Sequence, residues 1–139
     1  MDIEIINGPN LNLLGKREPS VYGKQDFESF FNTIKIEFPE HSLTYFQSNH
    51  EGDLIDRIQE IGFSHGGIVL NPGGLSHTSV ALTDVVAAVS TPIIEVHISN
   101  IHDRERFRHH SYISRNALGT IVGLGLNGYR LAIRALIEK

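Results

Sequence analysis

The side chains best suited to acid–base chemistry fall in three segments, residues 7–23, 71–79 and 97–100. The first segment contains Tyr22 and Arg17. A phenol ionises near pH 10, so it acts as a base at neutral pH only if its anion is stabilised by about 4 kcal/mol, which demands a close cation. Arg17 is the nearest guanidinium in the sequence and is the candidate for that role. In the alternative interpretation, Tyr22 packs at the surface and Arg17 is solvated.

The second segment, Asn-Pro-Gly-Gly-Leu-Ser-His-Thr-Ser at residues 71–79, ends a strand-like run and precedes a helix-like one. Backbone N–H groups at a helix N-terminus bind anions, so this segment is a candidate site for an anion or an oxyanion. It lacks the lysine of a P-loop and the glycine spacing of a dinucleotide site, which argues against nucleotide phosphates. The simpler alternatives are that Ser76 caps the helix and that Asn71 serves as a turn residue.

The third segment places His97 directly after an apolar run, at the end of a predicted strand. A histidine side chain can donate a proton near neutral pH. Glu95 lies two residues earlier. Because alternate residues of a strand point to one face, Glu95 is a candidate to orient or charge-stabilise the imidazole. The alternative is a strand-end histidine whose ring is satisfied by backbone carbonyl groups.

Further histidines, arginines and lysines bear on which chemistry is open to the chain. Three histidines near Asp103 match no recognised ligand spacing, so no metal is expected; they are His102, His109 and His110. The arginines between them form either a basic edge suited to holding a carboxylate or a solvated run of charge; they are Arg104, Arg106 and Arg108. No lysine falls on a predicted strand, where burial would suit it to imine chemistry; the lysines are Lys16, Lys24, Lys35 and Lys139.

Hydrophobic periodicity predicts the elements that must position these segments. Short apolar or β-branched runs predict strands at residues 3–6, 43–46, 68–70, 93–96 and 120–122. Apolar residues at helical spacing predict helices at residues 27–38, 54–61, 80–88 and 129–136. The alternation predicts an α/β fold, a flavodoxin-like three-layer sandwich whose five-stranded parallel sheet has the order 2-1-3-4-5 and helices on both faces. Ligands of such sheets bind beyond the carboxyl ends of the strands, where the three polar segments fall.

Composition limits the class of protein further. The 139 residues, 40% hydrophobic and 20% charged, indicate a single domain spanning residues 1–139. Twelve Lys and Arg against 16 Asp and Glu give a net charge of -4, which argues against nucleic acid as a partner. No cysteine is present and the chain opens with Met-Asp-Ile-Glu, unlike a signal peptide, so we expect a cytoplasmic location. No apolar run approaches the roughly 20 residues that cross a bilayer, so no membrane association is expected.

Three motifs carry a family resemblance. They are Asn-Gly-Pro-Asn-Leu-Asn-Leu-Leu-Gly at residues 7–15 with Arg17-Glu18-Pro19 and Tyr22-Gly23, then Asn71-Pro72-Gly73 with His77-Thr78-Ser79, then Glu95-Val96-His97-Ile98-Ser99-Asn100. In this order, and with Gly123-Leu124-Gly125 before the last helix, they resemble the type II 3-dehydroquinate dehydratases over nearly the whole chain. The family commonly has an aromatic residue near position 75, where this chain has Leu75.

The resemblance implies a hydro-lyase of the shikimate pathway that removes water from 3-dehydroquinate to give 3-dehydroshikimate, without a metal or an organic cofactor. It implies an anti elimination through an enolate, with Tyr22 as the base, Arg17 as the cation beside its phenolate and His97 as the acid. Asn10 and Asn71 match positions that hold Tyr22, a bound water or the enolate oxygen, and Asn71 is the better candidate for substrate contact. A base, an acid and an enolate stabiliser are also what proton abstraction beside a ketone requires.

The resemblance also implies the remaining contacts and the assembly. Its substrate-binding positions match His77, Ser99, Arg108 and the backbone of Ile98, and an acidic position that reaches the neighbouring subunit's site matches Asp84. The family forms trimers that assemble into a dodecamer. The competing classes are a flavin carrier, a phospho-acceptor regulator and a purely structural assembly protein. A regulator requires paired acidic residues after the first strand and a lysine near the end of the fifth, where this chain has Asn7 and Gly123.

The placement of the lysines gives a first prediction. Borohydride added with 3-dehydroquinate traps no covalent adduct, because no lysine is positioned to form an imine with the ketone. Intact-mass spectrometry measures this directly. A borohydride-dependent mass increase that maps to Lys16 or Lys24 contradicts the prediction.

Overall fold

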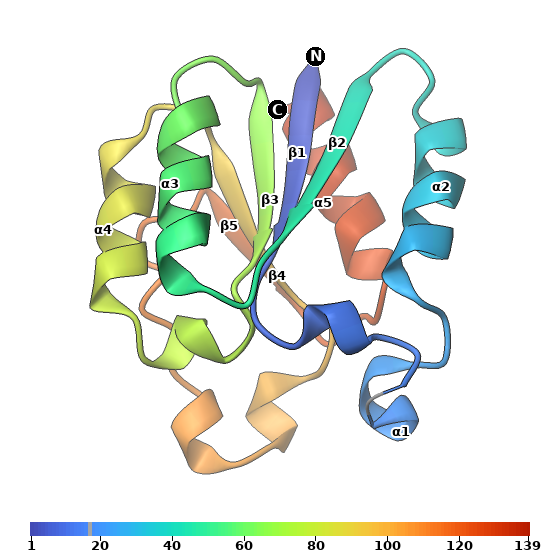
Figure 1. Ribbon diagram of the computed structural model, residues 1–139, viewed down its shortest axis with the longest axis vertical. Helices are drawn as coiled ribbons and strands as arrows, with labels where there is room; N and C mark the ends of the chain where they lie inside the picture. Colours follow the sequence, from blue (N-terminus) through green and yellow to red (C-terminus); the bar gives the residue numbers. More distant parts are fainter. Residues whose placement is uncertain (17) are drawn as a thin grey trace.

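The computed structural model describes residues 1–16 and 18–139, and within them five strands form one parallel sheet (Figure 1). The strands are β1 (Asp2–Asn7), β2 (Ser42–Gln47), β3 (Gly67–Asn71), β4 (Ile93–His97) and β5 (Gly119–Val122). Their order is β2-β1-β3-β4-β5, and every neighbouring pair is parallel. The predicted flavodoxin-like sheet and its order are confirmed.

Helices cover both faces of the sheet, which gives the three predicted layers (Figure 1). One face carries α2 (Phe27–Glu37) and α5 (Asn127–Glu138), and the other carries α3 (Glu51–Ile61) and α4 (Val80–Ala88). Asp26 caps α2, because its carboxylate accepts the Ser29 N–H at 2.8 Å. Among the described residues no helix combines the length and apolarity that crossing a bilayer requires.

The alternation of side chains along the strands divides the core into two apolar clusters. In β1, Ile3 and Ile5 pack under α2 and α5, whereas Ile6 packs under α3 and α4. The same alternation in β4 sends Ile94 and Val96 to the α2 and α5 side. Two polar residues of β4, Glu95 and His97, therefore share the face of the sheet that carries α3 and α4.

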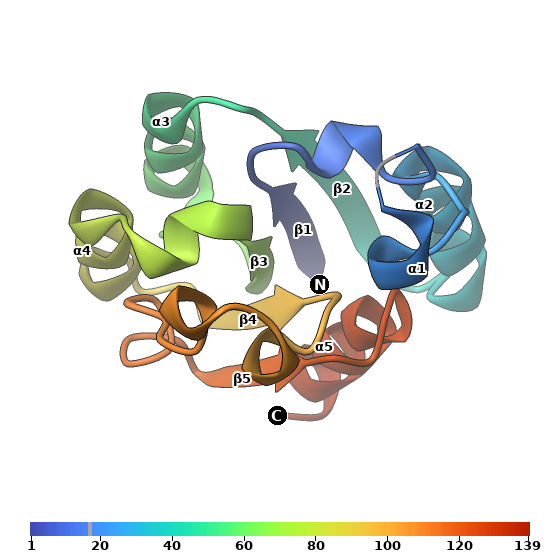
Figure 2. The same ribbon diagram turned by 90° about the horizontal axis from the view of Figure 1, so that it is seen from below.

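Short helices surround the carboxyl ends of the strands, which face the viewer in Figure 2. They are the helix α1 (Pro19–Tyr22) and the 3-10 helices η1 (Leu11–Leu13), η2 (Gly73–His77), η3 (Ile101–Asp103) and η4 (Arg106–Arg108). The turns after β1 and β3 touch, since a Cβ added to Gly8 would lie 2.5 Å from the carbonyl oxygen of Pro72. A glycine at position 8 thus brings the first two polar segments together.

A buried ion pair ties β1 to α3 on the face opposite α2. Arg57 binds both carboxylate oxygens of Glu4 at 2.6 Å, and the Thr44 hydroxyl donates to the same carboxylate at 2.7 Å. The Glu4 side chain is only 1% exposed, so water does not solvate its charge. A buried charge that loses its partner costs far more than an exposed one.

This contrast in burial predicts unequal losses of stability at two arginines. Arg57 and Arg130 are 27% and 28% exposed, yet the carboxylate of Glu4 is 1% exposed and that of Glu37, the partner of Arg130, is 32% exposed. We expect Arg57→Met to lower the free energy of unfolding by about 3 kcal/mol. The matched control Arg130→Met should lower it by less than about 1 kcal/mol. Denaturant titration measures both, and equal losses contradict the prediction.

Candidate active site

A pocket opens at the carboxyl ends of β1, β3 and β4, and most of the predicted site residues line it. Its walls come from the turn after β1, from α1, from η2 and from the segment after β4. The predicted residues among its lining are Asn10, Tyr22, Asn71, His77, His97, Ile98, Ser99 and Arg108. Asn10 has a backbone φ of 70°, and its N–H donates to the side chain of Asn49 at 2.9 Å. Arg17, the predicted cation, lies outside the described residues.

The phenol of Tyr22 bonds to a guanidinium that the sequence did not single out. Arg104 Nη1 donates to the Tyr22 oxygen at 2.8 Å and to Ser99 Oγ at 3.3 Å. The same guanidinium lies 5.6 Å from the centre of the Tyr22 ring. Tyr22 is also part of the apolar cluster under α2 and α5, so the interpretation of it as a surface residue is wrong. Among the described residues, the guanidinium at this hydroxyl is therefore that of Arg104.

Local chain geometry brings Arg104 to the pocket. The Asn100 side chain accepts the N–H of His102 at 3.1 Å and so caps η3, which turns the chain back over the pocket. Arg104 follows this turn and lines the pocket, whereas Arg106 is exposed and does not. In the sequence, the signal that separates Arg104 from Arg106 and Arg108 is Asn100, whose side chain caps the turn before Arg104.

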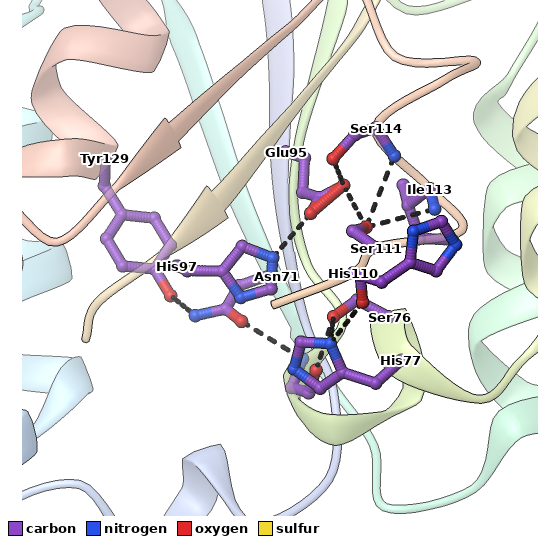
Figure 3. Close-up of polar contacts among 11 residues, drawn as sticks. Asn71, Ser76, His77, Glu95, His97, His110, Ser111, Ile113, Ser114 and Tyr129 are labelled. Carbon is purple, nitrogen blue, oxygen red and sulfur yellow. Dashed lines mark hydrogen bonds and ion pairs between the residues drawn. The ribbon is translucent and has the colours of Figure 1, made fainter. Parts of the chain in front are cut away.

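His97 is bonded to a carboxylate rather than to backbone carbonyl groups. Its Nε2 lies 2.5 Å from Oε2 of Glu95, which is fully buried (Figure 3). The other oxygen of Glu95 accepts from the hydroxyls of Ser111 and Ser114 at 2.8 and 3.0 Å. With Nε2 occupied by Glu95, His97 presents Nδ1 to the pocket. The expected pairing of Glu95 with the imidazole is present.

The carboxamide of Asn71 is held in one orientation. Its Nδ2 donates to the hydroxyl of Tyr129 at 2.8 Å, and its Oδ1 accepts the N–H of Gly73 at 3.1 Å (Figure 3). The Tyr129 hydroxyl in turn donates to Asn7 Oδ1 at 2.8 Å. Burial raises the pKa of Tyr129 well above the range in which a phenol ionises in water, so it acts as a neutral link. Asn71 therefore serves both as a turn residue and as part of the pocket wall.

His77 stands beside His97 with its ring oriented by the backbone. Nδ1 of His77 lies 2.7 Å from the carbonyl oxygen of His110, and so donates to it. The rings of His77 and His97 are stacked, with centroids 5.9 Å apart. Burial lowers the pKa of His77, and the nearby His97 and Arg108 act in the same direction, against the hydrogen bond to His110. The imidazole of His77 is therefore biased toward its neutral form.

One interpretation of this segment is wrong, and Asp84 lies outside the pocket. Ser76 does not cap α4, because Ser79 Oγ accepts the Leu82 N–H at 2.9 Å in that role and Ser76 Oγ donates to the Gly73 carbonyl. The predicted start of this helix at residue 80 is confirmed, because α4 begins at Val80. Asp84 is exposed on α4 and does not line the pocket. The described residues hold no group of three or more potential metal ligands.

Comparison with known proteins decides the family. Residues 1–137 match the family model described as dehydroquinase class II. The chain belongs to this family. A Bacillus subtilis (strain 168) protein named 3-dehydroquinate dehydratase is 53% identical over 138 residues, covering 97% of this chain and 93% of that protein. The crystal structure of a type II dehydroquinase from Butyrivibrio crossotus DSM 2876 superposes with a TM-score of 0.95 at 48% identity, covering 99% of this chain and 97% of that one.

The likeness extends to a more distant structure. A 3-dehydroquinate dehydratase-like protein from Bifidobacterium longum has a TM-score of 0.72 at 25% identity, over 100% of this chain and 99% of that one. Membership of the class II dehydroquinases makes this chain a hydro-lyase, so the flavin carrier and the regulator are excluded. The pocket at the strand ends is accordingly the candidate active site of a dehydroquinase.

The environment of His77 predicts how folding stability depends on pH. A histidine whose pKa is lower in the folded protein than the ordinary 6.5 stabilises the fold fully above that pH, and its contribution is lost as the pH falls. We expect the thermal midpoint of His77→Gln to fall less between about pH 7.5 and about pH 5 than that of the unaltered protein. The control His110→Gln replaces an exposed ring, and its thermal midpoint should fall as much as that of the unaltered protein. Identical pH profiles for His77→Gln and the unaltered protein contradict the assignment.

Proposed function

We propose that this class II dehydroquinase removes water from 3-dehydroquinate to give 3-dehydroshikimate. The observation that carries the proposal is the pairing within one pocket of a phenol bonded to a guanidinium and an imidazole bonded to a buried carboxylate. The first pair is suited to remove a proton and the second to deliver one. The relatives' printed name, 3-dehydroquinate dehydratase, identifies the substrate on which this chemistry is expected to act.

The reaction divides into two steps through an enolate. The Tyr22 phenolate takes a proton from C2, and the electron pair of the broken C–H bond forms the C2–C3 double bond and moves charge onto the C3 oxygen. The enolate then reforms the ketone as the C1–O bond breaks, and His97 protonates the departing hydroxyl, which leaves as water. The product is a conjugated enone. Arg104 stabilises the phenolate, and Asn71 is the candidate donor to the enolate oxygen.

The arrangement of base and acid supports an anti elimination. Tyr22 packs with the cluster under α2 and α5, whereas His97 lies on the face of β4 that carries α3 and α4. The two groups thus reach the pocket from opposite sides of the sheet. A base and an acid that act from opposite sides remove the proton and the hydroxyl from opposite faces of the ring.

The remaining predicted residues are assigned to binding. Arg108 and His77 line the pocket and would hold the ring hydroxyls, while the backbone at Ile98 and Ser99 would hold the carboxylate. Arg17 would add a second cation beside Tyr22, and Asn10 would hold the phenol or a water. No metal or organic cofactor takes part in these steps.

Assembly and location complete the proposal. Asp84 is exposed on α4, outside the pocket of its own chain, which suits a side chain that reaches the site of a neighbouring subunit. In keeping with the family resemblance, we also propose trimers that assemble into a dodecamer. We place the enzyme in the cytoplasm, as one catalytic domain acting in the shikimate pathway.

Ultraviolet absorbance tests the activity and the base together. The purified protein should convert 3-dehydroquinate into a product with the absorbance of a conjugated enone, and Tyr22→Phe should lower kcat by about 10³-fold, because only the ionisable hydroxyl is removed. Tyr112→Phe is the matched control and should retain full activity, since the Tyr112 hydroxyl lies outside the pocket and the substitution keeps the backbone hydrogen bonds of residue 112. An inactive but folded unaltered protein contradicts the function, and near-normal turnover by Tyr22→Phe excludes it as the base.

A substitution that removes the positive charge tests the guanidinium beside the phenol. Arg104→Gln should lower kcat by about 10²-fold, because the amide cannot stabilise a phenolate as a cation does. Arg106→Gln removes an equal charge from the same segment outside the pocket and should leave kcat unchanged. Steady-state kinetics on the two variants measures the difference. Equal effects would mean that Arg104 acts only through long-range charge.

A further inference from the structure

One oxygen of the buried Glu95 carboxylate receives two hydroxyl donors that lie outside the pocket. Ser111 Oγ and Ser114 Oγ donate to Oε1 at 2.8 and 3.0 Å, while Oε2 faces His97 Nε2 (Figure 3). Neither serine lines the pocket. Both belong to the irregular segment between η4 and β5, and in the described part of the chain their hydroxyl groups reach the site only through hydrogen bonds to Glu95.

The direction of the Ser111 hydroxyl is determined by its neighbours. Its oxygen accepts the N–H groups of Ile113 and Ser114 at 3.1 and 3.3 Å. A hydroxyl has two acceptor positions and one proton, so the remaining proton must point at Glu95. Ser111 is for this reason an obligatory donor to the carboxylate.

Two donors on Oε1 occupy the positions at which that oxygen would hold a proton. Any proton shared between Glu95 and His97 is therefore confined to the line between Oε2 and Nε2. The two hydroxyl donors therefore fix the orientation of the carboxylate, with Oε2 turned toward Nε2 of His97. The Nδ1 nitrogen is then the atom of His97 that exchanges a proton with a ligand in the pocket.

We propose that Ser111 and Ser114 are positioning residues for the acid: by donating to Oε1 of Glu95 they hold its carboxylate so that Oε2 faces Nε2 of His97 and Nδ1 faces the pocket. This inference rests on the proposed function, because it assumes that His97 delivers the proton to the leaving hydroxyl. Among the residues that the structure describes, the other titratable or charged groups that line the pocket around His97 are Tyr22, His77, Arg104 and Arg108. In the described part of the chain, none of these four groups forms a hydrogen bond with Glu95.

The same segment also orients the second imidazole of the site. The carbonyl of His110 accepts from His77 Nδ1, and the N–H of Tyr112 donates to the carbonyl of Ser76 at 2.8 Å. The Thr83 hydroxyl anchors the segment to α4 by donating to the Tyr112 carbonyl at 2.6 Å. Residues 110–114 thus orient both rings. The backbone carbonyl of His110 bonds to His77, and the two serines act on His97 through Glu95.

Ser114→Ala is the most direct test, because its hydroxyl bonds to Glu95 whereas that of Ser111 also supports the turn. We expect kcat to fall roughly tenfold with KM nearly unchanged, since a donor to a charged group is lost and no substrate contact is removed. Ser114→Thr retains the hydroxyl and should restore most of kcat. The thermal midpoint of each variant checks that the fold is intact.

A double-mutant cycle separates positioning from a purely structural role. If Ser114 acts through the carboxylate, Ser114→Ala should produce no further loss of kcat in a Glu95→Gln background. Additive losses in the two backgrounds, a loss confined to KM, or no loss in the single variant each overturn the inference while the unaltered enzyme remains active. An unaltered protein that does not turn over 3-dehydroquinate defeats the proposed function itself, and this inference with it.

Discussion

A carboxylate withdrawn completely from water is the constraint on which the site depends. Glu95 has 0% exposure, and a charge in that setting is tolerated only when its oxygens are hydrogen-bonded. His97 satisfies one oxygen and two serine hydroxyls satisfy the other. This requirement determines the path of residues 110–114 behind the pocket, and that path in turn orients His77. The buried Glu95 carboxylate thereby links His97 to residues 110–114, and the same residues bond to His77.

The parallel sheet brings a second reactive group, the phenol of Tyr22, into the same pocket as His97. Parallel strands end at one edge, and here the chain leaves β1, β3 and β4 into the walls of the same pocket. Gly8 lets the turns after β1 and β3 touch. The Tyr129 hydroxyl links Asn7 and Asn71 at the ends of these strands, so the wall is built on buried elements rather than on exposed loops.

The parts that the sequence predicts well are those determined by local periodicity. Strands, helices and sheet order follow from apolar spacing and from the handedness of the crossovers, and all are confirmed. The contact of Glu95 with His97 follows from the two-residue period of one strand. Arg104 was missed because 82 residues separate it from Tyr22 and because Arg106 and Arg108, which follow it closely in the sequence, offer the same side chain. The serines behind Glu95 carry no spacing signal, and Ser79 rather than Ser76 caps α4 because a 3-10 turn intervenes.

A crystal structure with a non-reactive carbocyclic analogue of 3-dehydroquinate is the most direct test that the phenol and the imidazole serve one ligand. The account predicts that the Tyr22 oxygen and His97 Nδ1 each lie within about 3.5 Å of the same ring, with Arg104 still bonded to the phenol. An analogue that binds in this pocket with either group out of reach, or that binds elsewhere, contradicts it.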